Sequence, residues 1–390
     1  MKKLGIRKIF LAFIILALWW MALVPIQVAV AQEKVIKIGH IYPITGAQTD
    51  YWVTEVKSAE LATQEINNAG GIKGYKIKVL TEDGEALPLP SSNAAKKLIT
   101  QDKVDILIGG ESSPAGIAMA EIATKNGVPH IVPTALAENI TSSGKYKYLF
   151  RTAPHNGMVG AYLGELLADH FKFTRVATIF FQDDFGIDLN NVVVGALKKK
   201  GVNVLAQEGV ERTLVDFYSI VSKFKPLNPQ VIVAPIYNKP AAQLAITMRE
   251  QGMKGVRIGD TVMLTPTFIQ LAGEASWGSI HVPLFHHSKP TPEAQAFVQR
   301  FYAKYKVYPE NFAGETYDAF AITFDALKRG GIGPKGFDRD GFVKAMRETN
   351  NFPGVMGPLK FDQNGQCFGK GKYTPVENIK GELKAIKVNF

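Results

Sequence analysis

Hydrophobic and polar positions follow two alternating periods along most of the chain. Short apolar runs typical of strands are followed by longer segments in which apolar residues recur at helical spacing. In residues 53–69, for example, Val56, Ala59 and Ile66 fall on one helical face, and Gly70 follows where a helix commonly ends. The pattern therefore predicts strands and helices in alternation.

Two such sets are predicted, one before and one after about residue 153. In the first set the expected strands are 35–41, 75–80, 104–109 and 128–133, and the expected helices are 53–69, 92–101 and 114–126. In the second set the strands are 175–181, 202–208, 231–235 and 256–258, and the helices are 187–200, 214–224 and 240–251. Further helices are expected at 292–305, 314–329 and 341–349, and a hairpin over 359–372 that turns at Asn364-Gly365.

Strand and helix alternation at this spacing is typical of parallel sheets covered by helices on both faces. We therefore expect an α/β protein with two Rossmann-like lobes and parallel central sheets. Ligands of such sheets bind beyond the carboxyl ends of the strands. The expected binding loops are 42–52, 109–114, 133–139, 182–186, 235–240 and 259–266.

The first 31 residues have the pattern of an export signal. Four basic residues precede an uncharged apolar run from Ile9 to Val24, and Ala29-Val30-Ala31 provides small residues for cleavage before Gln32. The alternative, a transmembrane anchor, needs about 20 apolar residues, and this run is shorter. We therefore predict a cleaved signal peptide over residues 1–31 and a periplasmic or otherwise extracytoplasmic mature protein.

Composition narrows the class of protein further. Removing residues 1–31 from the 390-residue chain leaves 359 residues, enough for two domains of ~150 residues each. The single cysteine, Cys367, excludes both an internal disulfide and a lipid anchor at the cleavage site. The densest basic run, residues 198–200, closes a predicted helix, where cations suit the helix dipole, so we expect no nucleic-acid binding.

The segment Gly109-Gly110-Glu111-Ser112-Ser113-Pro114 is the sharpest local motif. A strand ends and a helix begins there, with Ser113 expected at the N-cap, so free backbone N–H groups and a hydroxyl could bind a carboxylate or phosphate. The alternative is that Ser113 only caps its helix. Asp183-Asp184 could likewise bind a metal or an ammonium, or only cap a loop.

Other motifs are weaker evidence for a function. Gly331-x-Gly333-x-x-Gly336 follows a helix and contains Pro334, whereas a dinucleotide loop follows a strand and opens a helix. His286-His287 has no third ligand at a suitable spacing, so we expect no metal. We also expect no cofactor, since no cofactor loop or nucleophile motif is found.

Several motifs, in their order along the chain, resemble those of a known protein family. They are Ile38-Gly39, Thr45-Gly46, Asn67-Asn68-Ala69-Gly70-Gly71-Ile72, Gly74-Tyr75-Lys76-Ile77, Asp184-Phe185-Gly186, Val355-Met356-Gly357-Pro358-Leu359 and Phe361-Asp362 with Gly365. With them the mature chain resembles the leucine/isoleucine/valine-binding family, the type I periplasmic solute-binding proteins of ABC importers.

The resemblance implies two lobes joined by three hinge crossings that close over a small solute. The crossings would lie near Thr152–Asn156, near His281–His286 and just after Pro358. Lobe 1 would comprise 33–153 plus 284–358, and lobe 2 would comprise 154–283 plus 359–390. The implied partners are a small-molecule ligand and the membrane permease of an ABC importer, and we expect a monomer.

The resemblance also implies which residues hold the ligand. The expected ligand-binding residues are Tyr51, Trp52, Ser112, Ser113, Thr134, Ala135, Leu136, Asp184, Phe185, Tyr237 and Asp260. Leu136 stands where amino-acid-binding members have threonine, and Asp260 is offset by one position from their glutamate. We therefore expect an apolar or aromatic carboxylate or a neutral amide in place of a branched-chain amino acid, although Asp183, Asp184 or Asp260 could restore an ammonium site.

Two other functions remain open at this stage. The chain could be the ligand-binding subunit of a sensory system, since similar folds serve that role. It could also be an exported α/β enzyme, but that reading needs a positioned nucleophile and base, and neither is found in the sequence.

Overall fold

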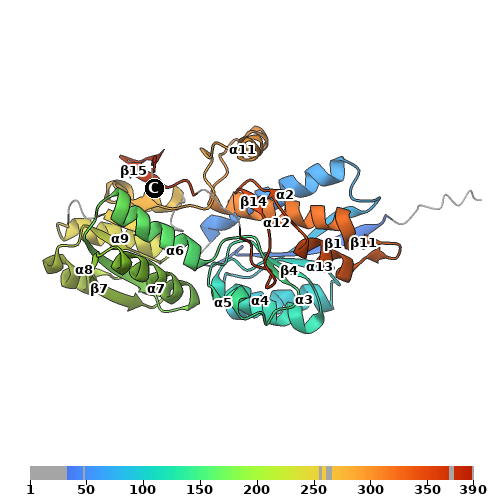
Figure 1. Ribbon diagram of the computed structural model, residues 1–390, viewed down its shortest axis with the longest axis horizontal. Coiled ribbons are helices and arrows are strands. Elements are labelled where there is room, and N and C mark those ends of the chain that lie inside the picture. The colour runs from blue at the N-terminus through green and yellow to red at the C-terminus, as the bar shows by residue number, and fades with distance from the viewer. Residues whose placement is uncertain (1–32, 47–48, 254–256, 261–265, 369–372, 389–390) are drawn as a thin grey trace, which may run out of the picture. The chain divides into compact units, whose positions relative to one another are not determined.

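The first five strands form one parallel sheet. The computed structural model describes residues 33–46, 49–253, 257–260, 266–368 and 373–388. The strand order of this first sheet is β2-β1-β3-β4-β5 (Figure 1). Its elements are β1 (Val35–Tyr42), α2 (Thr49–Asn68), β2 (Lys76–Asp83), α3 (Pro88–Thr100), β3 (Ile106–Gly109), α4 (Ser113–Asn126), β4 (His130–Val132), α5 (Asn139–Ser142) and β5 (Leu149–Arg151). The strand order reverses at β1 and β3, which is where ligands bind in such sheets.

The second sheet has the order β16-β15-β10-β9-β8-β6-β7. Strands β6 to β10 are parallel, and the β15–β16 hairpin adds antiparallel to β10. Its elements are α6 (Asn156–Glu165), η1 (Leu166–His170), β6 (Arg175–Phe181), α7 (Asp184–Lys199), β7 (Asn203–Val210), α8 (Tyr218–Phe224), η2 (Lys225–Leu227), β8 (Val231–Val233), α9 (Asn238–Glu250), β9 (Arg257–Asp260), α10 (Pro266–Ala272), η3 (Gly273–Ser276), β10 (Ile280–His281), β15 (Val376–Ile379) and β16 (Glu382–Ala385).

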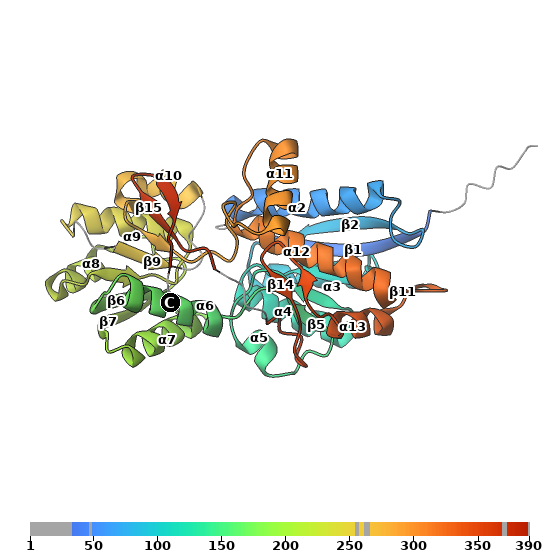
Figure 2. The ribbon, with the colours of Figure 1, turned by 45° about the horizontal axis from the view of Figure 1, so that its top comes forward.

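The chain between β10 and β15 returns to the first sheet. Its elements are α11 (Pro292–Tyr305), α12 (Asn311–Ala326), η4 (Leu327–Gly331), β11 (Ile332–Gly333), β12 (Gly336–Phe337), α13 (Arg339–Arg347), β13 (Phe352–Pro353) and β14 (Pro358–Leu359). Helix α12 packs along α2, far earlier in the sequence, and Figures 1 and 2 both show the two helices side by side. This pairing matters for the site because it buries residues of α2 that would otherwise face water.

Alternating side chains of the strands serve two cores on each sheet. In β3, Ile106 and Ile108 pack with α2, α12 and α13, whereas Leu107 packs with α3 and α4. In β6, Val176 packs with α6 and α7, and Ala177 packs with α8 and α9. This alternation is the period of two that a strand imposes, and burial on both faces is expected of parallel strands.

The α/β class and the alternating elements are confirmed, with ends shifted by a few residues. Helix α6, strand β5 and the β15–β16 hairpin were not predicted from the sequence. Of the expected hairpin over 359–372, Pro358–Leu359 pairs instead with β13, and one antiparallel bridge, Phe361 to Cys367, spans the turn at Gly365; residues 369–372 lie outside the described residues. The run 331–336 forms the β11–β12 hairpin.

The third crossing does not lie just after Pro358 as expected. Leu359, Phe361 and Cys367 are buried in the core that α12 and α13 share with the first sheet, and the Cys367 N–H donates to the Arg151 carbonyl at 2.9 Å. The chain therefore stays with the first sheet until after Cys367. The two-lobe division itself stays a proposal, in which lobe 2 resumes after Cys367 and not just after Pro358.

Contacts divide the chain into Met1–Lys34 and Val35–Phe390, and the second unit holds both sheets. The expected signal peptide, residues 1–31, lies outside the described residues. Among the residues that are described, no helix is long and apolar enough to cross a membrane.

Candidate functional site

One cavity collects residues from loops of both sheets. It contains about 390 Å³ of space, part of it open to solvent. The residues that line it are Glu55, Glu111, Ser112, Ser113, Thr134, Ala135, Leu136, Phe185, Tyr237 and Phe312. Seven of the eleven expected site residues are therefore brought together, at the carboxyl ends of β3, β4, β6 and β8, as predicted for doubly wound sheets.

The loop after β3 depends on two glycines. Gly109 and Gly110 have φ of +146° and +103°, and a Cβ on Gly109 would lie 2.3 Å from the Ile41 carbonyl oxygen. Any other residue would strain this turn or collide with β1. The turn carries Glu111, Ser112 and Ser113 to the cavity.

Ser112, not Ser113, is the N-cap of α4, which corrects the sequence-based expectation. Ser112 has extended backbone angles, its Oγ accepts from the Ala115 N–H at 3.3 Å, and its hydroxyl donates to the Ala86 carbonyl at 2.6 Å. Ser113 begins the helix, and its Oγ accepts from the Ala137 N–H at 3.0 Å. The Ser113 hydroxyl hydrogen is therefore left to donate, and the Ser113 N–H is among the unpaired groups of the first helical turn.

Arg151 holds the loop after β4 from behind. Its side chain is fully buried, and its Nη1 donates to the carbonyls of Ala135 and Ala137 at 3.2 and 2.5 Å. Its Nε and Nη2 donate to Gln366 and Thr141 at 2.6 and 2.9 Å. Burial lowers the pKa of Arg151, and these acceptors compensate part of the lost hydration. The loop bearing Thr134, Ala135 and Leu136 is thereby fixed.

The other side of the cavity is aromatic. The rings of Phe185 and Tyr237 stack with centroids 5.9 Å apart and planes 11° apart. Gly186 allows this placement, since a Cβ there would lie 2.2 Å from the Phe181 carbonyl oxygen. Arg212 lies over the Tyr237 ring at 5.2 Å and donates to its hydroxyl at 3.1 Å. We call Phe185 and Tyr237 the aromatic wall.

The first sheet contributes the polar wall, which we define as Glu55, Glu111, Ser113 and Thr134. Thr134 is 5% exposed, and its Oγ1 has no hydrogen-bond partner. Burial raises the pKa of Glu55 well above its usual value, and the charges of Glu111 and Glu315 add to the shift. Burial also raises the pKa of Glu111 to about 8. Burial therefore favours the neutral form of both carboxyl groups.

Two expected site residues are placed away from the cavity. Asp184 Oδ1 accepts from Asn139 Nδ2 at 2.9 Å on the exposed side of α7. Asp260 is buried and pairs with His281 Nδ1, whose other ring nitrogen lies 2.7 Å from Ser279 Oγ. Neither carboxylate lines the cavity, because each already serves a partner within the protein.

Three further residues expected at or near the site come from α2 and from the start of α7. Tyr51 and Trp52 lie in α2, but their side chains are outside what the structure describes. Asp183 caps α7 by accepting from the Gly186 N–H at 2.9 Å, and it pairs with Arg212. Of the two alternatives considered for this residue, ligand binding or capping, the structure shows capping. Within the described residues, no group of three His, Cys, Asp or Glu side chains is arranged to hold a metal ion.

Sequence reasoning missed the two glutamates of the polar wall and Phe312. Glu55 shares a helical face with Ala59 and Ala62, both buried, so its position in an apolar stripe was a usable signal. Glu111 lies inside the motif Gly109–Pro114, where its position beside the two serines was a usable signal. Phe312 comes from α12, whose approach to the site is not visible in the sequence.

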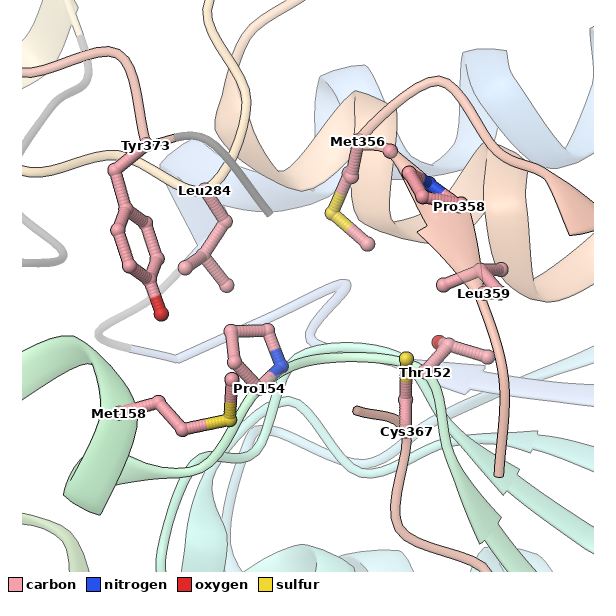
Figure 3. Close-up of a pocket in the computed structure, with 10 residues that line it drawn as sticks. Thr152, Pro154, Met158, Leu284, Met356, Pro358, Leu359, Cys367 and Tyr373 are labelled. Atoms are coloured by element: carbon pink, nitrogen blue, oxygen red, sulfur yellow. The ribbon is translucent and has the colours of Figure 1, made fainter. Parts of the chain in front are cut away.

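A second cavity, of about 440 Å³, lies where the expected crossings meet. Figure 3 shows its side chains around an open space, with the sulfur of Cys367 directed into it. Thr152 and Pro154 come from the first expected crossing, Leu284 from the second, and Met356 precedes the third. Its lining is mostly apolar and has no charged side chain among the described residues, so this cavity lacks groups to orient a polar ligand.

Comparison with known proteins agrees with this arrangement. Residues 35–374 match a family model described as periplasmic binding protein. A "Leu/Ile/Val-binding protein homolog 1" from Brucella abortus (strain 2308) is 27% identical over 328 residues, which is 84% of this chain and 86% of the relative.

Two solved structures have the same fold. LivJ of Streptococcus pneumoniae, solved with isoleucine, is 25% identical with a TM-score of 0.81, covering 91% of this chain and 100% of that chain. A solute-binding protein of R. palustris, solved with benzoate, is 24% identical with a TM-score of 0.80, covering 90% and 95%. Because the family model spans nearly all of the two-sheet unit, the chain belongs to the periplasmic binding protein family, and the relatives and neighbours named above are solute-binding proteins.

Proposed function

We propose that this protein is the extracytoplasmic receptor of an ABC importer and captures a small organic solute between its polar wall and its aromatic wall. The observation that carries the proposal is the composition of the cavity: hydrogen-bonding groups come from the first sheet and stacked rings from the second. A solute that contacts both walls favours the arrangement in which they lie close together.

The solute classes that fit this cavity are amino-acid-like molecules, amides, and apolar or aromatic carboxylates. A carboxylate or carbonyl oxygen would accept from the Ser113 hydroxyl and N–H and from the Thr134 hydroxyl, at the N-terminus of α4. An apolar body would lie against Phe185 and Tyr237. Relatives named for leucine, isoleucine and valine, and neighbours solved with isoleucine or benzoate, support this range.

Release to a membrane permease would follow opening about the hinge crossings. Thr152 and Pro154 of the first crossing, Leu284 of the second, and Cys367 and Tyr373, which flank the third, meet around the second cavity, and this supports a hinge there. Hinge motions of this kind need a few segments that absorb the change while both cores stay intact. We propose capture without bond-making, by a monomer exported through the cleaved signal peptide.

A solute screen tests this function. Ligands that bind only the folded state raise its melting temperature, so a thermal-shift screen of amino acids, amides and aromatic carboxylates should reveal at least one stabilising solute. Small-angle scattering should then show a smaller radius of gyration at saturating solute. Mass spectrometry of the incubated solutes should return unchanged molecules, and a conversion product would contradict the proposal.

A further inference from the structure

Three buried carboxyl groups meet beside the polar wall. Glu55 comes from α2, Glu111 from the loop before α4, and Glu315 from α12. Glu55 and Glu315 are each 1% exposed, and Glu55 and Glu111 line the cavity. Glu315 joins them because α12 packs along α2, although the two segments are 260 residues apart in the sequence.

Most of their oxygen atoms have no partner. Both carboxyl oxygens of Glu55 are buried without a hydrogen bond, as are Oε1 of Glu111 and Oε2 of Glu315. The other two oxygens accept from the Gly110 N–H at 3.3 Å and from Asn311 Nδ2 at 2.7 Å. Buried polar atoms without partners are rare and costly, and they point to a group that the protein expects to receive.

Asp318 shows what a satisfied carboxyl group looks like on the same helix. It is fully buried, one turn from Glu315, and accepts from the N–H groups of Val355 and Met356 at 2.7 and 3.0 Å. The fold therefore supplies donors to a buried acid of α12 where the acid is structural. It supplies none to either oxygen of Glu55.

A separate observation places an unsatisfied donor in the same cavity. Thr134, from the loop after β4, is 5% exposed, and its Oγ1 also has no partner. The polar wall thus carries unpaired groups of two kinds from three segments of the first sheet. Contacts within the protein satisfy neither kind of group, whereas a bound solute would form hydrogen bonds with both.

The charged groups around the cluster do not neutralise it. In the described part of the chain, no lysine, arginine or histidine forms an ion pair with any of the three glutamates. Tyr42 of β1 lies near Glu55; burial raises the pKa of Tyr42, and the charge of Glu55 adds to the shift. Arg212, the cation nearest the aromatic wall, is already paired with Asp183.

We propose that the cavity recognises a protonated amine, and that Glu55 and Glu111 hold its N–H groups while Glu315 strengthens the negative field. This inference rests on the proposed function and selects among its solute classes: the solute is a primary amine or an amino acid, and not a plain carboxylate or amide. An ammonium supplies the donors that the unpaired oxygens lack. Ionisation of a carboxyl group on binding releases its proton to solvent.

The test uses two sets of solutes. Within each set the apolar part of the molecule is the same and the charged or polar group differs. Phenethylamine, L-phenylalanine, 3-phenylpropionate and 3-phenylpropionamide form one set; isoamylamine, L-leucine, 4-methylpentanoate and 4-methylpentanamide form a second. Calorimetry of the full mature protein at pH 7, in buffers of different ionisation enthalpy, measures both affinity and proton release. Amine-bearing probes should bind at least about tenfold more tightly than their carboxylate or amide counterparts and should release protons.

Variants of α2 provide the control. Glu55→Gln should weaken binding of the amine probes roughly tenfold or more and reduce proton release. Glu60→Gln lies on the same helix, where Glu60 is exposed and pairs with Lys304, and should leave both unchanged. Glu55→Gln removes an unpaired buried acid, so it should fold at least as stably as the wild type.

The outcomes separate this inference from the proposed function. Binding by carboxylates or amides alone, or amine binding that Glu55→Gln leaves intact, overturns the amine inference and leaves a solute receptor. If no probe binds and native mass spectrometry of the purified protein finds no retained solute, both the inference and the proposed function are contradicted.

Discussion

The two walls of the cavity use their polar residues differently. On the polar wall, Glu55 and Thr134 are buried with side-chain oxygens that have no partner. On the side of the aromatic wall, Asp183 caps α7 and pairs with Arg212, while Asp260 pairs with His281. A carboxylate in a binding loop is thus no guide to ligand contact by itself. The guide is a buried carboxyl group whose hydrogen bonds the protein leaves unmade.

This difference suggests a division of labour. The polar wall is rigidly supported, by Arg151 behind the loop after β4 and by the cap of Ser112 at α4, and can orient the charged end of a solute. The aromatic wall offers ring surfaces for stacking, which constrain the orientation of a solute less than hydrogen bonds do. Specificity for the head group should therefore reside in the first sheet, and tolerance of the solute body in the second.

Removing Arg151 should have the largest effect. Arg151→Met leaves the carbonyls of Ala135 and Ala137 and the side chains of Thr141 and Gln366 without their donor. We expect a loss of about 3 kcal/mol or more in the free energy of unfolding, measured by urea denaturation. A loss below about 1 kcal/mol would show that the loop after β4 needs no such support.

The two adjacent serines separate binding from capping. Ser113→Ala should weaken solute binding by roughly tenfold to a hundredfold, because a hydrogen bond to a charged group contributes about 1.5–3 kcal/mol. Ser112→Ala should instead lower stability by about 1 kcal/mol through loss of the helix cap, with a smaller effect on affinity. Calorimetry and thermal melts of both variants make the comparison. Equal affinities of Ser113→Ala and wild type would reduce Ser113 to a structural residue.

The raised pKa of Glu111 predicts the direction in which the stability of the solute-free protein changes with pH. Its pKa is about 8 in the folded state and 4.5 in a model peptide, so its contribution to stability is complete below pH 4.5 and is lost as the pH rises to about 8. Buried His40 and His130, with pKa values lowered to about 3 and 4, act in the opposite sense, but only below about pH 6.5.

Between pH 6.5 and 8 the melting temperature of the wild type should therefore fall. The raised pKa of Asp318, about 7, adds to this fall in every variant, so the informative quantity is the difference from Glu111→Gln. That variant should show a shallower decline over the same pH range. Parallel curves for the two proteins would mean that Glu111 is already ionised in the empty cavity.

Asp184 should have the smallest effect. Its carboxylate accepts one exposed hydrogen bond from Asn139, so Asp184→Ala should change stability by no more than about 0.5 kcal/mol and affinity by less than about threefold. A tenfold loss of affinity for an amine probe would instead restore Asp184 as the ammonium partner on the side of the aromatic wall.

The sequence predicted much of the fold and seven of the ten residues that line the first cavity. Period and glycine signals located β1, α4 and α7 closely, and the strand-end rule led to Ser113, Phe185 and Tyr237, which do line the cavity. Their role in binding stays a prediction. These successes share a cause, since each depends on local pattern or on which end of a strand a loop follows.

The failures depend on pairing between distant segments. Asp260 looked available because its partner, His281, enters only through the register of β9 and β10. Glu55 lies in an apolar stripe of α2, but α12, the helix that covers this stripe, lies some 260 residues away in the sequence, so the place of Glu55 beside the cavity has no local signal. The third crossing was misplaced because the packing of Phe361 and Cys367 against the first sheet leaves no local signal.

A crystal structure with bound solute tests the central claim most directly, using the molecule that co-purifies with the protein or the probe that stabilises it most. We predict solute density in the first cavity, with an amine nitrogen within hydrogen-bonding distance of Glu55 and Glu111 and the solute body against Phe185 and Tyr237. Density in the second cavity beside Cys367, with the carboxyl oxygens of Glu55 still unpaired, would contradict the account.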